Sequence, residues 1–182
     1  MDVSQPYGLV GGEGFPGGRV FFRPTGEYRG KYLGQETSFV DAQPDIPKIP
    51  ELSESICSVW IAKSSCVPTV TQSMIGIMTG SSLGIVTTYA LGYDPSGPRY
   101  NPGEMSARWI LSPGVPIIAL KVDDSYSQKR KALTRVWAVA LNALGEVYYM
   151  TQPPNPPFSK TKTDDSTKFA CTSQNFNRVR IT

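Results

Sequence analysis

The chain contains no histidine among its 182 residues, and this removes the side chain that most often serves as a general base. It therefore has no Ser–His or Cys–His pair and no imidazole ligand for a metal ion. Two pairs of adjacent carboxylates remain, Asp123–Asp124 and Asp164–Asp165, but both lie in polar, solvated stretches and would make poor acid–base pairs. A Ser–Lys mechanism and a carboxylate glycosidase need no histidine, yet no spacing in the chain points to either. We predict that the protein is not an enzyme and has no catalytic residues, metal or cofactor.

One glycine-rich segment formally fits the dinucleotide-binding pattern G-x-G-x-x-G, at residues 12–17. That pattern requires a helix directly after the turn, whose N-terminus then binds the phosphates. Here Pro16 interrupts the turn, and residues 19–22 (RVFF) indicate a strand where the helix should begin. We expect a loop here and no nucleotide site.

Positive charge gathers in two places. The first is a run of three basic residues, Lys129, Arg130 and Lys131, with Arg135 shortly after it. The second is a basic tail that comprises Lys160, Lys162, Lys168, Arg178 and Arg180. Such residues suit phosphate contacts in a nucleic acid, whereas the simpler interpretation of the first group is a solvated loop. Because the net charge is only +3, nucleic-acid binding is the alternative function and not the main one.

The long Pro/Gly-rich segment at residues 92–105 supplies candidate partner contacts. Loops on a rigid framework often carry binding residues, and Tyr and Arg frequently anchor protein interfaces. Tyr93, Arg99 and Tyr100 are therefore the partner-binding candidates.

Two apolar segments must position these groups, and they share one layout. Residues 74–91 (MIGIMTGSSLGIVTTYAL) and 135–150 (RVWAVALNALGEVYYM) each contain an apolar strand, a short turn with Leu-Gly, and a second strand rich in β-branched or aromatic residues. Gly84 and Gly145 would supply the positive φ that a tight turn needs, with Gly80 as a further turn residue. Gly145 lies 61 residues after Gly84, so the two hairpins form an internal repeat.

Apolar side chains fall on both faces of each hairpin, and we therefore expect both faces to be buried. A helix is the alternative for residues 135–147, which are rich in Ala and Leu. The parallel with the first hairpin, whose Gly, Ser and Thr are poor helix formers, favours strands. Further strands at residues 56–62, 107–111 and 116–122 complete the pattern. The sequence predicts an all-β fold of antiparallel four-stranded units.

Residues 80–91 (GSSLGIVTTYAL) resemble the hairpin between the second and third strands of a WD40-type β-propeller blade, where Gly-Ser-x-Asp-Gly-x-Val leads into a strand ending in Trp-Asp. Leu83 and Leu144 replace the turn Asp, Tyr89-Ala90 replaces Trp-Asp, and no Gly-His dipeptide is present. The resemblance covers residues 56–150. It implies WD40-like blades in an incomplete ring, because closed rings use about four to eight blades of roughly 40–45 residues.

The same resemblance implies a noncatalytic scaffold for protein–protein interaction. The long inserts resemble those of divergent propeller subunits in fungal nuclear assemblies, so the implied partners are other protein subunits and the implied setting is transcription or chromatin in the nucleus.

Composition sets the remaining expectations. The 17 Gly and 16 Pro argue against a helical bundle, and no apolar segment approaches the ~20 residues that cross a membrane. Three cysteines without a CxxC motif indicate a reducing intracellular compartment, with Cys57 as a buried strand residue in preference to a disulfide with Cys66. We divide the chain into a Gly/Pro-rich leader with remnant strands of an upstream blade (1–52), two blades (53–152) and a flexible polar tail (153–182), and expect a fragment or partial propeller.

Overall fold

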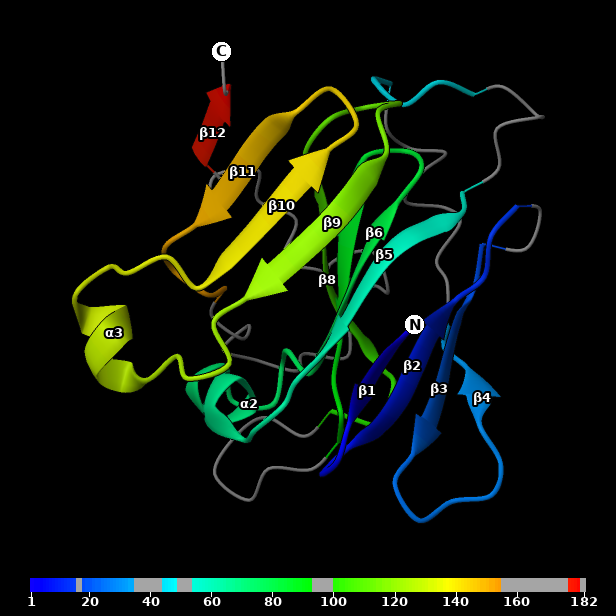
Figure 1. Cartoon of the computed structure of the whole chain (residues 1–182), viewed down its shortest axis with the longest axis vertical. Coiled ribbons are helices and arrows are strands. Elements are labelled where there is room, and N and C mark those ends of the chain that lie inside the picture. The colour runs from blue at the N-terminus through cyan, green and yellow to red at the C-terminus, as the bar shows by residue number, and fades with distance from the viewer. Residues whose placement is uncertain (16–17, 35–43, 49–53, 93–99, 155–176, 181–182) are drawn as a thin grey trace, which may run out of the picture.

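The computed structural model describes residues 1–15, 18–34, 44–48, 54–92, 100–154 and 177–180, the last four as backbone only. They form three antiparallel sheets of four strands each, in chain order (Figure 1). Sheet 1 contains β1 (Asp2–Ser4), β2 (Gly8–Gly12), β3 (Val20–Pro24) and β4 (Lys31–Tyr32). Sheet 2 contains β5 (Ile56–Ile61), β6 (Ile77–Ser81), β7 (Ile85–Tyr89) and β8 (Met105–Ile110). Sheet 3 contains β9 (Ile117–Val122), β10 (Ala138–Asn142), β11 (Glu146–Met150) and β12 (Asn177–Arg180). Two short helices, α2 (Cys66–Val70) and α3 (Gln128–Ala132), lie between the first and second strands of sheets 2 and 3.

The predicted all-β, antiparallel fold is confirmed, and so are the two equivalent hairpins. In sheet 2 the hairpin pairs Ile77 with Tyr89, and in sheet 3 it pairs Ala138 with Met150. The second pair lies one repeat of 61 residues after the first, so both hairpins have the same register. The helical alternative is wrong, since β10 and β11 occupy most of that segment.

The turn glycines behave differently from one another. Gly84 and Gly145 both have φ of 79°, as the tight turns require. Gly80, in contrast, lies inside β6 and is not a turn residue. A Cβ built on it would lie 2.6 Å from the Ile117 Cγ2 atom, so glycine is needed there for the close approach of β9.

Both ends of the chain hold more strand than predicted. Residues 1–34 form a complete sheet where remnants were expected, because the glycines of β2 leave room for close neighbours: a Cβ on Gly8 would lie 2.1 Å from the Arg23 carbonyl oxygen. At the other end, β12 pairs with β11 within the segment predicted to be a flexible tail. The basic run at residues 129–131, for which a solvated loop was the simpler interpretation, lies in α3.

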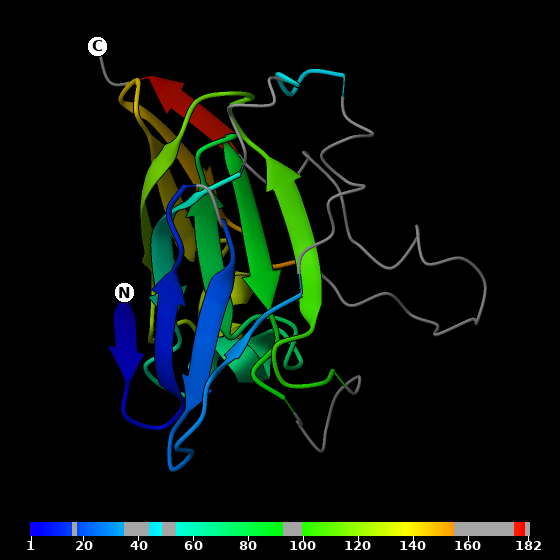
Figure 2. The same cartoon turned by 90° about the vertical axis from the view of Figure 1, so that its right-hand side faces the viewer.

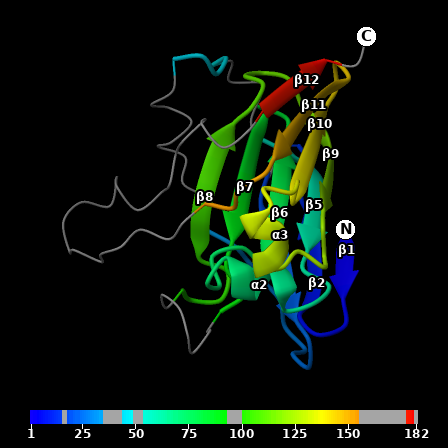
Figure 3. The same ribbon diagram turned by 90° about the vertical axis from the view of Figure 1, so that its left-hand side faces the viewer.

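The three sheets are successive layers, with sheet 2 between the other two (Figures 2 and 3). One core lies between sheets 1 and 2; it comprises Val10, Val20, Phe22, Leu33, Ile61, Ile77 and Tyr89. A larger core lies between sheets 2 and 3; its members include Trp60, Met78, Val86, Trp109, Ala138, Ala140, Tyr148 and Met150. Because successive side chains of a strand point to opposite faces, sheet 2 uses both of its faces in packing.

The predicted burial of both hairpin faces holds for only one hairpin. Every residue of β6 and β7 is buried, whereas β10 and β11 alternate buried and half-buried residues. The prediction of burial on both sides is therefore wrong for sheet 3, because the described residues place another sheet against only one of its faces.

Candidate interaction surfaces

The sheets are joined in the same way twice. A Cβ on Gly12 of β2 would lie 2.4 Å from the Ile56 Cγ2 atom at the start of β5. Likewise, a Cβ on Gly80 of β6 would lie 2.6 Å from the Ile117 Cγ2 atom at the start of β9. Ser58 strengthens the second joint by donating a hydrogen bond to the Ile117 carbonyl oxygen at 2.8 Å. Each joint thus places an isoleucine against a glycine in the second strand of the preceding sheet.

We call the face of a sheet that points toward the next sheet along the chain its forward face, and the opposite one its back face. The forward face of the sheet 2 hairpin holds Met78, Gly80, Val86 and Thr88, which sheet 3 covers. One repeat of 61 residues later, the equivalent positions are Val139, Leu141, Val147 and Tyr149. All four are half-buried.

These four residues, with Ala119 and Lys121 of β9, form the open forward face of sheet 3. Its neighbour Ile118, beside the bulge of β9, is also 49% exposed. Apolar residues therefore occupy a surface whose counterpart in sheet 2 packs against another sheet.

Sheet 1 has a corresponding open back face. Register places Val3, Leu9, Gly11, Phe21, Arg23 and Tyr32 on the side facing away from sheet 2. Val3 is 56% exposed and Tyr32 49% exposed. The Phe21 and Tyr32 rings meet edge to face with centroids 5.6 Å apart. This face is therefore mainly aliphatic and aromatic, with two cations on it: exposed Arg23 lies opposite Leu9, and the Arg19 guanidinium lies 4.0 Å from the Tyr32 ring centroid.

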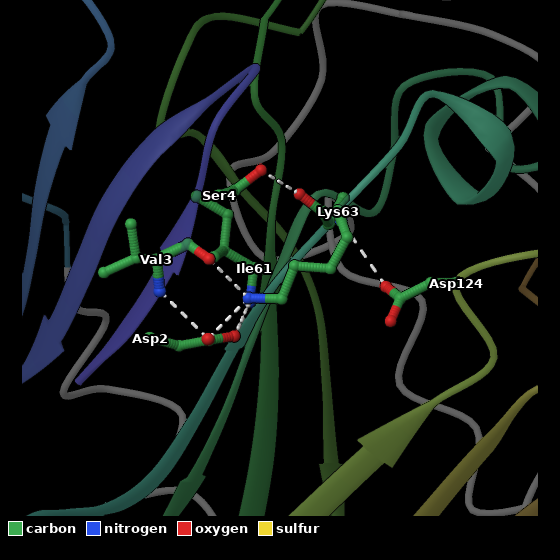
Figure 4. Close-up of polar contacts among 7 residues, drawn as sticks. Asp2, Val3, Ser4, Ile61, Lys63 and Asp124 are labelled. Carbon is green, nitrogen blue, oxygen red and sulfur yellow. Dashed lines mark hydrogen bonds and ion pairs between the residues drawn. The ribbon is translucent and has the colours of Figure 1, made fainter.

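A polar cluster ties sheet 1 to the end of β5 (Figure 4). The Lys63 ammonium donates to the Asp2 carboxylate and, at 2.7 Å, to the Val3 carbonyl oxygen, while the Ile61 N–H donates to Asp2 Oδ2 at 3.0 Å. Partial burial opposes the charge of Asp2, but the hydrogen bonds from Lys63 and Ile61 and the nearby ammonium outweigh it and lower the pKa of this carboxyl.

The same cluster reaches sheet 3 through Asp124, the second residue after β9. The Lys63 N–H donates to Asp124 Oδ1 at 3.4 Å, and the Ser64 hydroxyl donates to the Asp124 carbonyl oxygen at 2.8 Å. All three sheets are therefore linked at one end of their first strands. Asp123 pairs with the Arg130 guanidinium, so both adjacent carboxylates make structural contacts; Asp164 and Asp165 lie outside the described residues.

The predicted basic patch lies on and beside α3. Ser127 caps this helix, its side-chain oxygen accepting a hydrogen bond from the Arg130 N–H at 3.4 Å. An open hollow of about 830 Å³ separates the helix from the approach to β10; it is lined by Asp123, Ser127, Lys129, Arg130, Leu133, Thr134, Arg135 and Val136. Lys131 is half-buried on the same helix. Of the basic tail, Arg178 and Arg180 belong to β12, whereas Lys160, Lys162 and Lys168 lie outside the described residues.

The structure covers only one of the three predicted partner anchors. Tyr93 and Arg99 lie outside the described residues. Tyr100 is half-buried and packs against the core between sheets 2 and 3. Burial raises the pKa of its phenol, and the negative charge of Glu104 acts in the same direction. Tyr100 thus supports the core at least as much as it offers a contact to a partner.

Within the part of the chain that the structure covers, no three His, Cys, Asp or Glu residues come together to hold a metal ion. Cys57 and Cys66 are free thiols, and Cys57 is exposed, so its predicted burial is wrong: it lies at the bulge where the pairing of β5 with β6 shifts register. Among the helices of the described ranges, none has the length and apolar composition needed to cross a membrane.

No protein-family model, curated protein or solved structure matches the chain.

Sequence reasoning missed the two open faces, the glycine joints and the Asp2–Lys63 contact. The 61-residue repeat could have identified the forward face of sheet 3. Met78 and Val86 pack against the next sheet, and Val139 and Val147 stand one repeat after them. The polar contact joins residues 61 positions apart in different sheets, and no local pattern marks it.

Proposed function

We propose that the protein is a noncatalytic scaffold for protein–protein interaction, whose sheets are blades of a WD40-like β-propeller in an incomplete ring. We place it in a larger intracellular assembly with other protein subunits, in the nucleus and in transcription or chromatin. One observation carries the proposal: the open forward face of sheet 3 repeats, position for position, the face with which sheet 2 holds its neighbour.

The chemistry of that face favours an apolar partner surface. Fully burying a Val or Leu side chain contributes about 1.5–3 kcal/mol. Val139, Leu141 and Val147 are each already more than half buried, so covering the rest of all three would contribute at most roughly 2–3 kcal/mol before the costs of association. The aromatic Tyr149 beside them is a residue type enriched at interface centres.

Photo-crosslinking in the source cells tests this function. A benzophenone amino acid at position 141 should yield a discrete covalent adduct with a protein, because the side chain there would lie under the partner. The matched control is position 27, where exposed Glu27 lies in the turn between β3 and β4 and should yield no discrete adduct.

The salt and nuclease dependence of the adduct completes the test. An apolar contact should give the same yield when the salt is raised to about 0.5 M, since screening acts on charges. Absence of an adduct at position 141, or an adduct that nuclease removes, would contradict the scaffold function.

One observation favours the alternative, a nucleic-acid-binding module. Lys129 and Arg135 are exposed around the hollow beside α3, where they would suit phosphate groups. In that case the affinity for a single-stranded oligonucleotide falls steeply between 50 and 200 mM salt, as counterion release requires. The double variant Lys129→Ala/Arg135→Ala would reduce the slope of that dependence, whereas Leu141→Lys would not.

A further inference from the structure

We infer that the open forward face of sheet 3 packs against the open back face of sheet 1 in a second copy of this chain, so that two copies close a ring of six sheets. This inference rests on the proposed scaffold function and names its partner.

The first argument is the rule by which the sheets pack within one chain. Sheet 2 presents its back face to the forward face of sheet 1, and sheet 3 presents its back face to the forward face of sheet 2. Every described sheet-on-sheet contact therefore joins a forward face to a back face. The sheets that the structure describes leave one face of each kind open within a single chain, and a second copy supplies the missing counterpart of both.

The second argument is the position that each joint uses. Within the chain, the second-strand residue at each joint, Gly12 or Gly80, lies against the isoleucine that begins the first strand of the next sheet. Leu141 stands at the repeat position of Gly80. The same packing rule therefore places Leu141 against β1 of the second copy, where Val3 is 56% exposed on the back face.

The third argument is symmetry. A forward-to-back contact between copies is heterologous, and such contacts form a closed ring or an open filament. Two copies of a three-sheet chain give six sheets, a number within the range of about four to eight found in closed rings of small sheets. Closure covers all four open faces.

Analytical ultracentrifugation of the purified full chain tests the inference. The wild type should sediment as a dimer of the 19.9 kDa chain, with dissociation on dilution. Leu141→Lys alters the forward face and Leu9→Glu alters the back face. Each should weaken the dimer by about 100-fold or more, because a homodimer of either variant carries the charge in both contacts. Leu144→Lys is the control: Leu144 is 69% exposed at the tip of the same hairpin, and this variant should dimerise as the wild type does.

Mixing the two variants distinguishes the geometry. In a Leu141→Lys and Leu9→Glu heterodimer, one contact is unaltered and the other places a lysine opposite a glutamate, so the mixture should regain the dimer that neither variant forms alone. Circular dichroism of each variant shows that the loss does not come from unfolding.

The remaining outcomes would overturn the inference. A wild type that stays monomeric up to about 200 μM refutes the second copy, and the scaffold function then still stands if position 141 cross-links to a different protein in cells. A ladder of higher masses refutes the closed ring. A dimer that only one variant disrupts indicates a contact between identical faces, which refutes the forward-to-back geometry.

Discussion

Replacing Gly84 by alanine provides a quantitative test of the fold, because the chain contains its own control. Gly84 and Gly145 are equivalent turn residues with the same φ of 79°. Their surroundings differ: a Cβ on Gly84 would lie 1.7 Å from the Ser112 carbonyl oxygen, whereas a Cβ on Gly145 would meet nothing within 4 Å. Gly145→Ala therefore measures backbone strain alone, and Gly84→Ala measures strain plus a steric clash.

The size of the difference follows from the hydrogen bonds around the turn. An L-residue in the left-handed region costs about 1–2 kcal/mol, and this applies to both variants. To relieve this clash, Gly84→Ala must shift the segment after β8, which is hydrogen-bonded to the turn. The N–H groups of Leu111 and Ser112 donate to the Gly84 carbonyl oxygen at 2.9 and 3.3 Å, and the Gly114 N–H donates to the Leu83 carbonyl oxygen at 3.1 Å. Each such bond contributes about 0.5–1.5 kcal/mol net. Losing two or three makes Gly84→Ala about 1–4 kcal/mol more destabilising than Gly145→Ala.

Urea unfolding followed by circular dichroism measures both values by linear extrapolation. We expect a loss of about 1–2 kcal/mol in the free energy of unfolding for Gly145→Ala and about 2–6 kcal/mol for Gly84→Ala. Asparagine tolerates positive φ, so Gly145→Asn should be close to wild type while Gly84→Asn should stay strongly destabilised. Equal losses for the two alanine variants would refute the close packing of the first turn against the segment after β8.

Three further predictions concern other contacts. Gly80→Val should lower the free energy of unfolding by about 2 kcal/mol or more in urea titrations, because its side chain would overlap the residue that begins β9; unchanged stability would contradict the joint between sheets 2 and 3. The lowered pKa of Asp2 means that its carboxylate stabilises the fold above its unfolded pKa of about 3.9 and that this stabilisation is lost as the pH falls through the folded pKa. Asp2→Asn should therefore be less stable than the wild type at pH 7, and thermal melts from pH 7 to 2 should show the gap narrowing toward acid. Glu146→Ala removes the carboxylate oxygen that accepts hydrogen bonds from the Asn142 side-chain amide and the Tyr148 hydroxyl, both at 2.9 Å. In urea titrations the free energy of unfolding should fall by at least about 1–3 kcal/mol, and a fall below about 0.5 kcal/mol would count against this buried network.

The strands of sheet 2 and the first three strands of sheet 3 could be predicted because their side chains act locally. Residues such as Ile77, Ile85 and Val139 favour extended backbone wherever they occur, and the glycines of both turns mark where the chain reverses. The first two strands of sheet 1 escaped prediction, and the second of them, GLVGG, is formed mainly by residues that weaken a strand in isolation. It is stabilised by Val10, which packs into the core with sheet 2.

The candidate surfaces were less accessible to sequence reasoning. Tyr100 was chosen as an anchor from residue type alone, but its half-buried position depends on packing against distant strands. Conversely, Val139 and Leu141 were expected in a fully covered interior, because an apolar side chain does not reveal whether a neighbouring sheet is present. Burial depends on tertiary contacts, and a single sequence records these only through the repeat.

Completing each sheet from consecutive strands has a consequence for synthesis and for evolution. Residues 1–34 contain every strand of sheet 1, so these strands are all synthesised before those of sheet 2, and the first layer can be completed as soon as sheet 2 supplies the other half of its core. Because no strand must thread between two others that are already paired, a gene that gains or loses one repeat unit alters the number of layers without rearranging those that exist. A duplication that adds a layer exchanges one exposed end surface for another, and in this way new specificity can arise while the older core is preserved.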